Sequence, residues 1–566
     1  MKVVVVGGVA GGASAAARLR RLDESAQILI FERSGFISYA NCGLPYYIGG
    51  VITEKRELTL QTPESFWTRF RIDALVHHEV LRIDRKNKKV TVKNLDTGRV
   101  YEEAYDKLIL SPGARPVLPD LPGIDSRRVY TLRTVEDTLK IRESAEGEKI
   151  RSAVIIGGGF IGVELAENLR RLGIEVSIVE KLPQLLGQFD ADMASFLHAH
   201  VREKGIHLHL GRSVEQFLEE NGGISVCMDG GEKLFADIAI AAVGVLPEST
   251  LAAEAGLALG VKNSIAVNEH MQTSDPDIYA VGDAAEITNG ITGQKTVMAL
   301  AGPANKQGRI AADHICGIKR PYRGAAGTSV LKVFDMTAAS AGLNERAARA
   351  AGIAYEKVIL SPVSHASYYP GGKVMTIKLL FEKTGKILGA QIAGFDGVDK
   401  RIDVLATAMQ ANLTVTELCD LDLAYAPPYS SAKDPINMAG FVAENVLAGR
   451  VKQFFYEDAL CLPRDGSVTL LDTRTEDEYR RGHAEGFDLN ISVDRLRERL
   501  EMLDRTKPVY VMCQSGLRSY IACRILTQSG FDCYNFAGGY RVYNSIHSQE
   551  AVSASAYPCG MAKSQG

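Results

Sequence analysis

The stretch Ala153-Val154-Ile155-Ile156-Gly157-Gly158-Gly159-Phe160-Ile161-Gly162 decides the fold of this 566-residue chain. An apolar strand runs into an intact G-x-G-x-x-G turn, a helix follows, and the next strand, 176–179, ends on Glu180. Such a turn lets the backbone approach a pyrophosphate, and the N–H groups at the helix start face its charge. The order of these elements predicts a dinucleotide-binding unit. Glu180 favours a free ribose 2′-hydroxyl and hence NADH, while Lys181 directly after it keeps NADPH possible.

A less regular copy of this unit stands at residues 1–35. The strand Val3–Val6 feeds the turn 7–12, a run of helix formers follows, and the strand 26–31 ends on Glu32. Val9 occupies the place of the middle glycine, and a tight structural turn is the alternative interpretation of this segment. Because the strand, turn, helix, second strand and acidic end all occur in order, we predict a second nucleotide-binding unit here.

A lone cysteine follows this first unit, in Ser38-Tyr39-Ala40-Asn41-Cys42-Gly43-Leu44-Pro45-Tyr46. Residues 37–47 hold no second sulfur, so Cys42 cannot form a disulfide with a near neighbour. Its redox partner must come from elsewhere. The alternatives are a small thiol in a mixed disulfide, the outer sulfur of a persulfide, or oxygen in a sulfenic acid.

A second cysteine, Cys513, lies in a C-x-x-x-x-R loop that ends at Arg518, between the apolar strand 509–512 and a predicted helix. Backbone N–H groups of the loop and the helix N-terminus are expected to converge on the sulfur and lower its pKa. The same field stabilises a persulfide anion. A buried structural cysteine is the alternative, and packing is the default for the remaining cysteines except Cys559, which lies in a small, polar tail.

Composition excludes several classes of protein. The net charge of -3, the hydrophobic content of 46% and the absence of a long apolar run predict a soluble chain with no nucleic-acid or membrane partner. The first residues match neither a signal peptide nor a transit peptide, which predicts a cytoplasmic location. The nine cysteines are scattered and include no C-x-x-C pair, so we expect no metal site and no disulfide framework.

The two Gly-rich turns, together with Ser111-Pro112-Gly113-Ala114 and Tyr279-Ala280-Val281-Gly282-Asp283, resemble the pyridine nucleotide–disulfide oxidoreductase superfamily. The resemblance implies that the first unit holds FAD and the second NADH, and that residues 325–445 form the interface of a homodimer. The residues implied to bind FAD are Gly7, Gly12, Glu32, Arg33, Ser111 and Asp283. Those implied to bind NAD are Gly157, Gly159, Gly162 and Glu180.

The sequence around Cys42 is similar to that of the coenzyme A disulfide reductases, a single-cysteine branch of this superfamily. That similarity implies coenzyme A as the sulfur partner, and the segment 301–309 matches a family segment that contacts it. The sister branch contains NADH oxidases and peroxidases, which use a sulfenic acid. The residues implied to bind coenzyme A are Arg18, Arg21, Ser38, Asn41, Asn305 and Arg309. Tyr368 and Tyr425 match catalytic tyrosines that reach the facing protomer's cysteine.

The last hundred residues resemble rhodanese sulfurtransferases. Asp472, Arg474, His483 and Gly538-Gly539-Tyr540 match the pattern, and four residues between Cys513 and Arg518 suit a persulfide loop. Gln514 stands where the family often has arginine. The resemblance implies that Cys513 carries sulfane sulfur.

The predicted fold class is α/β, with two nested Rossmann-like domains, an α+β dimerisation domain and a rhodanese-like α/β domain. The expected domains are 1–150 with 250–324 for FAD, 151–249 for NAD, 325–445 for dimerisation, 446–462 as a linker, 463–548 as the rhodanese domain and 549–566 as a flexible tail. The expected function is NADH-dependent reduction of coenzyme A disulfide, coenzyme A persulfide or polysulfide through Cys42, with sulfur delivered by Cys513. The alternatives are an NADH oxidase or peroxidase, a protein that is mainly a sulfurtransferase, and a redox-sensing binding protein.

Overall fold

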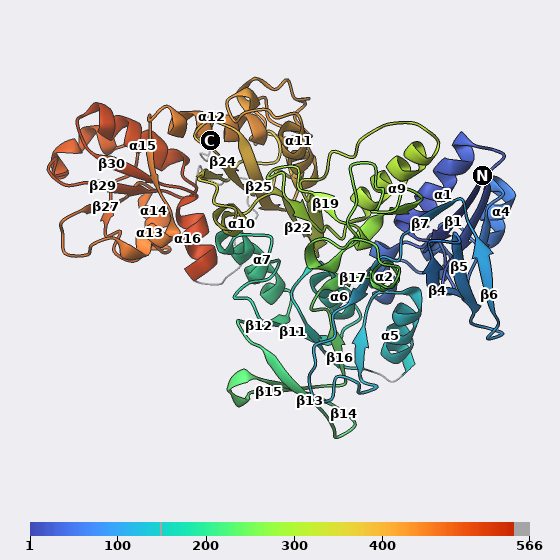
Figure 1. Ribbon diagram of the computed structural model, residues 1–566. Coiled ribbons are helices and arrows are strands. Elements are labelled where there is room, and N and C mark those ends of the chain that lie inside the picture. Colours follow the sequence, from blue (N-terminus) through green and yellow to red (C-terminus); the bar gives the residue numbers. More distant parts are fainter. Residues whose placement is uncertain (148–149, 548–566) are drawn as a thin grey trace. The chain divides into compact units, whose positions relative to one another are not determined.

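The computed structural model describes residues 1–147 and 150–547, apart from the side chains of residues 146 and 147. These residues form two compact units (Figure 1). The first unit contains residues 1–181 and 209–327, and the second contains residues 182–208 and the chain from residue 328 onward. The predicted tail with Cys559 lies outside the described residues, and the predicted domain boundaries stay a prediction.

A parallel sheet organises the N-terminal part of the first unit. Its strand order is β18-β7-β1-β2-β3, and β1 pairs in parallel with both β2 and β7. The run Val3–Val6 is buried because helices and loops cover both faces of the sheet, which explains why it reads as a continuous apolar segment. Figure 1 shows α1 and α9 side by side next to this sheet. The bounds are β1 (Lys2–Val6), β2 (Gln27–Phe31), β3 (Asp73–Leu75), β7 (Lys107–Leu110), β18 (Ile278–Ala280), α1 (Ala10–Leu22) and α9 (Ala301–Ile315).

A second parallel sheet is inserted in the first unit, with its strands in the order β11-β10-β16-β9. The predicted strand, glycine turn, helix and strand at residues 153–179 are confirmed. The bounds are β9 (Val129–Thr131), β10 (Ser152–Ile156), β11 (Glu175–Glu180), β16 (Ile238–Ala241), α5 (Val135–Gly147) and α6 (Phe160–Arg171).

Smaller elements complete the first unit. Two antiparallel three-stranded sheets and two strand pairs accompany the main sheets. The helices are α2 (Leu44–Ile48), α3 (Lys55–Leu58), α4 (Pro63–Phe70), α8 (Thr250–Glu254) and the short 3-10 helices η1 (Asn41–Gly43) and η4 (Gly282–Ala284). The strands are β4 (His78–Asp84), β5 (Lys89–Asn94), β6 (Val100–Ala104), β8 (Ala114–Pro116), β13 (Val214–Glu220), β14 (Gly223–Met228), β15 (Lys233–Ala236), β17 (Val245–Pro247), β19 (Ile287–Thr288) and β20 (Lys295–Thr296).

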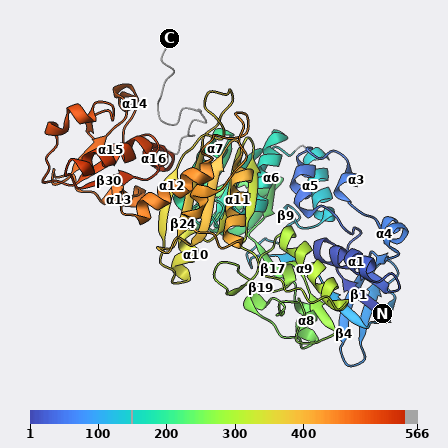
Figure 2. The ribbon, with the colours of Figure 1, turned by 90° about the horizontal axis from the view of Figure 1, so that it is seen from above.

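The second unit is built on an antiparallel sheet of order β21-β22-β25-β24-β23. Every residue of β24 and β25 is buried, and Figure 2 shows α11 and α12 packed along this sheet. The bounds are α7 (Ala191–Glu203), β21 (Ser329–Val333), β22 (Met336–Gly342), α10 (Glu345–Ala350), β23 (Glu356–Leu360), β24 (Met375–Phe381), β25 (Ile387–Gly394), α11 (Val398–Gln410) and α12 (Pro435–Leu447).

A buried lysine joins three elements of this unit. Lys378 of β24 is fully buried, and its Nζ lies 2.7 Å from Asp192 Oδ2 and 3.0 Å from Asp190 Oδ2. It also contacts Glu345 at the start of α10. Burial opposes ionisation of Glu345, but Lys378 and Lys357 lower its pKa to about 2. A buried charge is tolerated when it is fully paired, so this cluster fixes α7 and α10 to the sheet.

The C-terminal part of the second unit is a parallel sheet of order β26-β30-β29-β27-β28. Its first strand lies within the predicted linker, so part of that segment belongs to the sheet. The bounds are β26 (Lys452–Phe454), α13 (Tyr456–Cys461), β27 (Thr469–Asp472), α14 (Glu476–Arg480), β28 (Leu489–Asn490), β29 (Val509–Met512), α15 (Leu517–Gln528), β30 (Cys533–Phe536) and α16 (Gly539–His547). These four main sheets, three parallel and one antiparallel, confirm the predicted α/β fold class.

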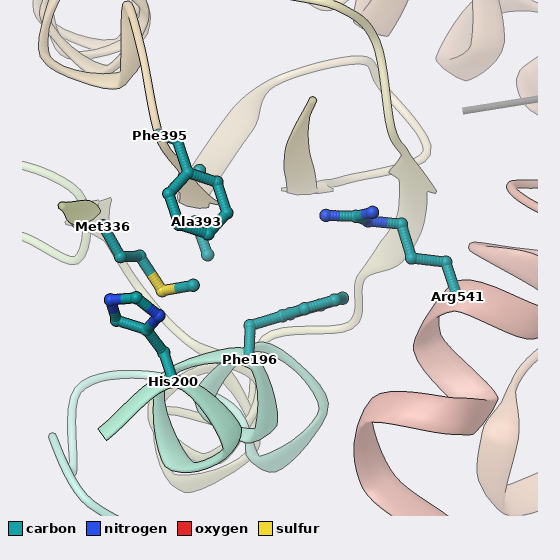
Figure 3. Close-up of a pocket in the computed structure, with 7 residues that line it drawn as sticks. Phe196, His200, Met336, Ala393, Phe395 and Arg541 are labelled. Atoms are coloured by element: carbon teal, nitrogen blue, oxygen red, sulfur yellow. The ribbon is translucent and has the colours of Figure 1, made fainter. Parts of the chain in front are cut away.

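Helix α16 attaches this C-terminal part to α7 and β24. Ser545 and Ser195 share a hydrogen bond of 2.7 Å, and Arg541 Nε donates to Thr376 Oγ1 at 3.2 Å. Figure 3 shows Arg541 reaching from α16 toward Phe196 and His200 of α7, beside a cavity of about 10 Å³. That volume holds one water at most, so the cavity is a packing feature rather than a ligand site.

Candidate active sites

Both glycine turns depend on residues that carry no side chain. A side chain on Gly7 or Gly157 would collide with backbone, and both residues have positive φ, +95° and +108°. Gly159 has open space where a side chain would point. Neither α1 nor α6 has a side-chain N-cap, so no side chain caps the N–H groups of their first turns. These features fit the predicted FAD and NAD sites.

The two acidic strand ends lie beside these turns. Glu32 accepts hydrogen bonds of 2.9 Å from Gly8 N and from Ser34 N, and Glu180 accepts one of 2.6 Å from Gly158 N. Ser111 O limits the space at Gly7 in the first turn, and Arg33 is an exposed residue directly after Glu32. Asp283 lies in η4 at the end of β18, the place predicted for it.

Cys42 lies in η1 and is exposed. Desolvation by the surrounding protein raises the pKa of its thiol, and the carboxylates of Glu164 and Asp283 raise it further. Arg133 lowers it. Cys42 therefore sits in a field of opposed charges, so the charge state of each neighbour affects how readily it forms a thiolate.

No sequence motif pointed to Glu164 or Arg133 as neighbours of Cys42. Glu164 is a half-buried residue of α6 that accepts a hydrogen bond of 3.3 Å from the hydroxyl of Tyr46. Burial raises the pKa of Glu164 to about 7. A pattern search could have noted a carboxylate two residues after the G-x-G-x-x-G turn, but its closeness to Cys42 arises only from folding.

The residues predicted for coenzyme A lie on α1, on α9, at the start of η1 and in the loop before η1. Arg18 Nε lies 2.7 Å from Asp313 Oδ1, which ties α1 to α9, and Ser14 hydrogen-bonds Asn305. Arg21, Asn305 and Arg309 are exposed. Ser38 has a positive φ of 48°, a conformation unusual for a serine that is often found at functional sites.

Tyr368 and Tyr425 belong to the second unit, whereas Cys42 belongs to the first. The two tyrosine hydroxyls lie 2.7 Å apart and both side chains are exposed, 73% and 47%. The hydrogen bond to Tyr425 raises the pKa of Tyr368. Residues 57 positions apart thus form one hydroxyl pair.

Cys513 lies at the end of β29 and is fully buried. Its Sγ accepts hydrogen bonds from Gly516 N at 3.1 Å and from Ser519 Oγ at 3.2 Å. Gly516 has a φ of +96°, which turns the loop into α15. One backbone donor and one hydroxyl therefore point at the sulfur, and a hydroxyl donor was not predicted.

Arg518 is held by a carboxylate. Its Nη1 and Nη2 lie 2.7 Å and 2.8 Å from the two oxygens of Glu478 in α14. Although burial works against ionisation of Glu478, the bonds from Arg518 and Thr475 keep its pKa below the usual range. Arg474 and Asp472 form a second buried pair, with 2.7 Å between Nη2 and Oδ2. These pairs give the loop a rigid base.

The described residues contain no further candidate site among their cavities, cysteines and metal-ligand side chains. A cavity of about 700 Å³ in the second unit is lined by residues of α7, α10, β23 and α13 and includes none of the predicted site residues. Among residues 1–147 and 150–547, all eight cysteines are free and no cluster of three or more metal-ligand side chains occurs. None of the helices within those ranges is long and apolar enough to cross a membrane.

Comparison with protein families matches three segments. Residues 1–308 match the family model described as pyridine nucleotide-disulphide oxidoreductase, and residues 328–435 match the dimerisation domain of that family. Residues 457–545 match the rhodanese-like domain.

Individual proteins are similar over most of the chain. A crystal structure of reduced Bacillus anthracis CoADR-RHD is 49% identical, with a TM-score of 0.94 over 98% of this chain and 99% of that one. The structure of a NAD-dependent persulfide reductase from A. fulgidus is 38% identical, with a TM-score of 0.91 over 97% of this chain and 100% of that one. The coenzyme A disulfide reductase of Staphylococcus haemolyticus is 36% identical over 79% of this chain and 100% of its own length.

Proposed function

Because the chain belongs to the pyridine nucleotide-disulphide oxidoreductase family and carries a rhodanese-like domain, we propose that it reduces sulfur bonded to coenzyme A. The substrates are coenzyme A disulfide, coenzyme A persulfide or polysulfide, and the electrons come from NADH through FAD. The observation that carries the proposal is Cys42, an exposed thiol with no neighbouring cysteine in residues 37–47. Such a thiol needs a redox partner from outside its own segment, and the sulfur of coenzyme A is the partner we propose.

The chain supplies the binding sites for both nucleotides. Gly7, Gly12, Glu32, Arg33, Ser111 and Asp283 would hold FAD, and Gly157, Gly159, Gly162 and Glu180 would hold NADH. When bound, FAD supplies the two-electron transfer that links NADH to a sulfur–sulfur bond. Glu180 sits beside the second turn, where its carboxylate would repel a 2′-phosphate, so we infer a preference for NADH.

The sulfur steps are assigned to Cys42. Its thiolate attacks coenzyme A disulfide, forms a mixed disulfide and releases one coenzyme A thiolate, which takes a proton. Two electrons then break the mixed disulfide, restore the Cys42 thiolate and release the second coenzyme A thiolate, which takes another proton. With coenzyme A persulfide, the Cys42 thiolate attacks the inner sulfur, forms the same mixed disulfide and releases hydrosulfide, and the two electrons then release coenzyme A thiolate. Arg18, Arg21, Ser38, Asn41, Asn305 and Arg309 would hold the coenzyme A molecule.

Cys513 is proposed to supply sulfane sulfur. Its thiolate attacks a donor such as thiosulfate, takes the outer sulfur as a persulfide and releases sulfite; a thiolate acceptor then removes that sulfur. The donors Gly516 N and Ser519 Oγ stabilise the anion in both states. The free thiol of coenzyme A is the acceptor we propose, because its persulfide is then a substrate for Cys42.

We further propose a cytoplasmic homodimer that acts on small molecules and binds neither nucleic acid nor a membrane. The match of residues 328–435 to a dimerisation domain supports the dimer. In it, Tyr368 and Tyr425 would present their hydroxyls to Cys42 of the facing protomer and donate a proton to the departing thiolate.

Anaerobic NADH oxidation tests the proposal. We expect fast turnover with coenzyme A disulfide and with coenzyme A persulfide, sulfide release in the second case, and loss of both in Cys42→Ser. Non-reducing mass spectrometry should find coenzyme A on Cys42 and an added sulfur on Cys513. Full persulfide reduction by Cys42→Ser would overturn the mechanism, and turnover that requires oxygen or peroxide would assign the chain to the oxidases.

A further inference from the structure

The side chain of Arg133 connects three elements around Cys42. This arginine lies between β9 and α5, and Asp137 of α5 accepts a hydrogen bond of 3.0 Å from its backbone N–H. The guanidinium donates through Nε to Ala114 O at 3.0 Å and through Nη2 to Asp283 Oδ2 at 3.0 Å. The Ser-Pro-Gly-Ala turn leaves room for it, since a side chain on Gly113 would come within 2.9 Å of Nη2.

The third nitrogen of Arg133 holds the residue directly before Cys42. In the orientation of the Asn41 amide that satisfies both of its ends, Nη1 donates to the amide oxygen at 2.7 Å and the amide nitrogen donates to Arg133 O at 3.1 Å. Two hydrogen bonds in opposite directions fix both the position and the orientation of an amide. The start of η1, and with it Cys42, is thereby anchored to Asp283 through one side chain.

The charged and titratable groups around Cys42 come from several elements. Glu164 of α6, Tyr46 of α2 and Asp283 of η4 are acids, and Arg133 is the cation that opposes them. An opposite charge close to a thiol favours the thiolate, and carboxylates disfavour it. Asp283 also bonds Arg133 at 3.0 Å, so the guanidinium pairs with one of the carboxylates that raise the pKa of Cys42.

We propose that Arg133 is the positioning residue of Cys42: its guanidinium holds the preceding residue, Asn41, and ties it to Ala114 and Asp283. This inference rests on the proposed function of Cys42. It also gives Asn41 a role in holding the cysteine, besides the contact with coenzyme A that the resemblance implies.

The test uses the full-length, FAD-loaded protein, reduced with NADH under anaerobic conditions. The rate of Cys42 alkylation by iodoacetamide is followed against pH by peptide mass spectrometry, per bound FAD. Arg133→Gln should raise the apparent pKa of Cys42, so that alkylation near neutral pH slows about tenfold. Arg133→Lys keeps a positive charge and should keep the alkylation profile close to the parent's, but it should lower turnover because Asn41 is no longer held.

Two further variants distinguish an effect of the Arg133 charge from an effect of misfolding on Cys42 alkylation. Arg115→Gln removes an exposed arginine next to Ala114, 4.0 Å from Glu248, and should leave alkylation within about twofold. Glu164→Gln removes an opposing carboxylate and should shift the profile to lower pH, the reverse of Arg133→Gln. An unchanged profile in Arg133→Gln would overturn the inference, while loss of turnover in Cys42→Ser would still support the proposed function. Full turnover in Cys42→Ser would instead remove the proposed function itself.

Discussion

Cys42 and Cys513 solve the same chemical problem, the control of a reactive sulfur, in different ways. Cys42 is exposed and surrounded by ionisable groups of both signs. Cys513 is fully buried and receives hydrogen bonds from a backbone N–H and a hydroxyl. The first environment responds to protonation of its neighbours, whereas the backbone N–H and the hydroxyl that donate to Cys513 do not titrate near neutral pH.

The difference matches the two proposed tasks. A sulfur that exchanges with a large substrate must be reachable, and the thiolate that leaves must find a proton. A sulfur that carries a persulfide anion needs fixed donors more than mobile protons. One chain can therefore give two thiols different reactivities. Ionisable side chains surround Cys42, and hydrogen-bond dipoles surround Cys513.

Replacing either cysteine by serine should give the largest loss of activity. Cys42→Ser should lower NADH-dependent reduction of coenzyme A disulfide by about 10³-fold or more, because serine forms no mixed disulfide, and should spare thiosulfate-to-cyanide transfer. Cys513→Ser should do the opposite. Steady-state assays of both reactions check this, and a variant that impairs both equally would contradict the division of tasks.

Lys378→Met should destabilise the second unit without touching either sulfur. It leaves buried carboxylates unpaired, which costs about 3–5 kcal/mol in the free energy of unfolding. The pKa of Glu345 is lowered to about 2, so its stabilisation is full above about pH 4.5 and is lost as the pH falls toward 2. Denaturant unfolding at several pH values measures both effects.

A matched control uses an exposed pair of the same unit. Lys386 lies 3.8 Å from Glu382 and is half exposed, so Lys386→Met should change stability by less than about 1 kcal/mol. If both variants lost the same free energy of unfolding, burial of the Lys378 ion pairs would not explain their stabilising effect.

Ser519→Ala probes the dipoles around Cys513. Loss of one donor to a charged sulfur should slow sulfur transfer about tenfold and leave NADH-dependent turnover unchanged. Thr527→Ala is the control, since it removes a hydroxyl of the same helix that bonds Cys533 Sγ at 3.2 Å. If both variants slow transfer to the same degree, the effect comes from the helix and not from the bond to Cys513.

Tyr368→Phe should give the smallest effect, about threefold on turnover with coenzyme A disulfide, because the hydroxyl of Tyr425 remains. The double variant with Tyr425→Phe should lose more than the product of the single losses. Tyr429→Phe changes another exposed tyrosine, 72% accessible, and should match the parent. Strictly multiplicative losses would mean that the two hydroxyls act separately.

Much of the fold could be predicted because its signals are local. Both glycine turns, the strands that feed them and the acidic ends at Glu32 and Glu180 occur within about thirty residues each, as a dinucleotide unit requires. The same holds for the strand, loop and helix around Cys513. Here periodicity, turn chemistry and charge agree along a continuous stretch of chain.

The surroundings of each sulfur could not be predicted in the same way. Arg133 and Glu164 lie far from Cys42 in sequence and belong to loops and helices of ordinary composition. Ser519 is close to Cys513 in sequence, but a serine in a helix carries no signal that its hydroxyl will bond a sulfur. The Lys378 cluster draws its carboxylates from two other elements, so no window of sequence contains it.

The sequence alone determined the fold class, the two nucleotide-binding units and the choice of Cys42 and Cys513, because these follow from local motifs and from the absence of a second sulfur near Cys42. The assignment of FAD and NADH to the two units came from the resemblance to the family. Only the tertiary structure decided which charges and donors meet each sulfur. That part depends on how distant elements pack, since electrostatic interactions act over a few ångströms in space whatever the separation along the chain.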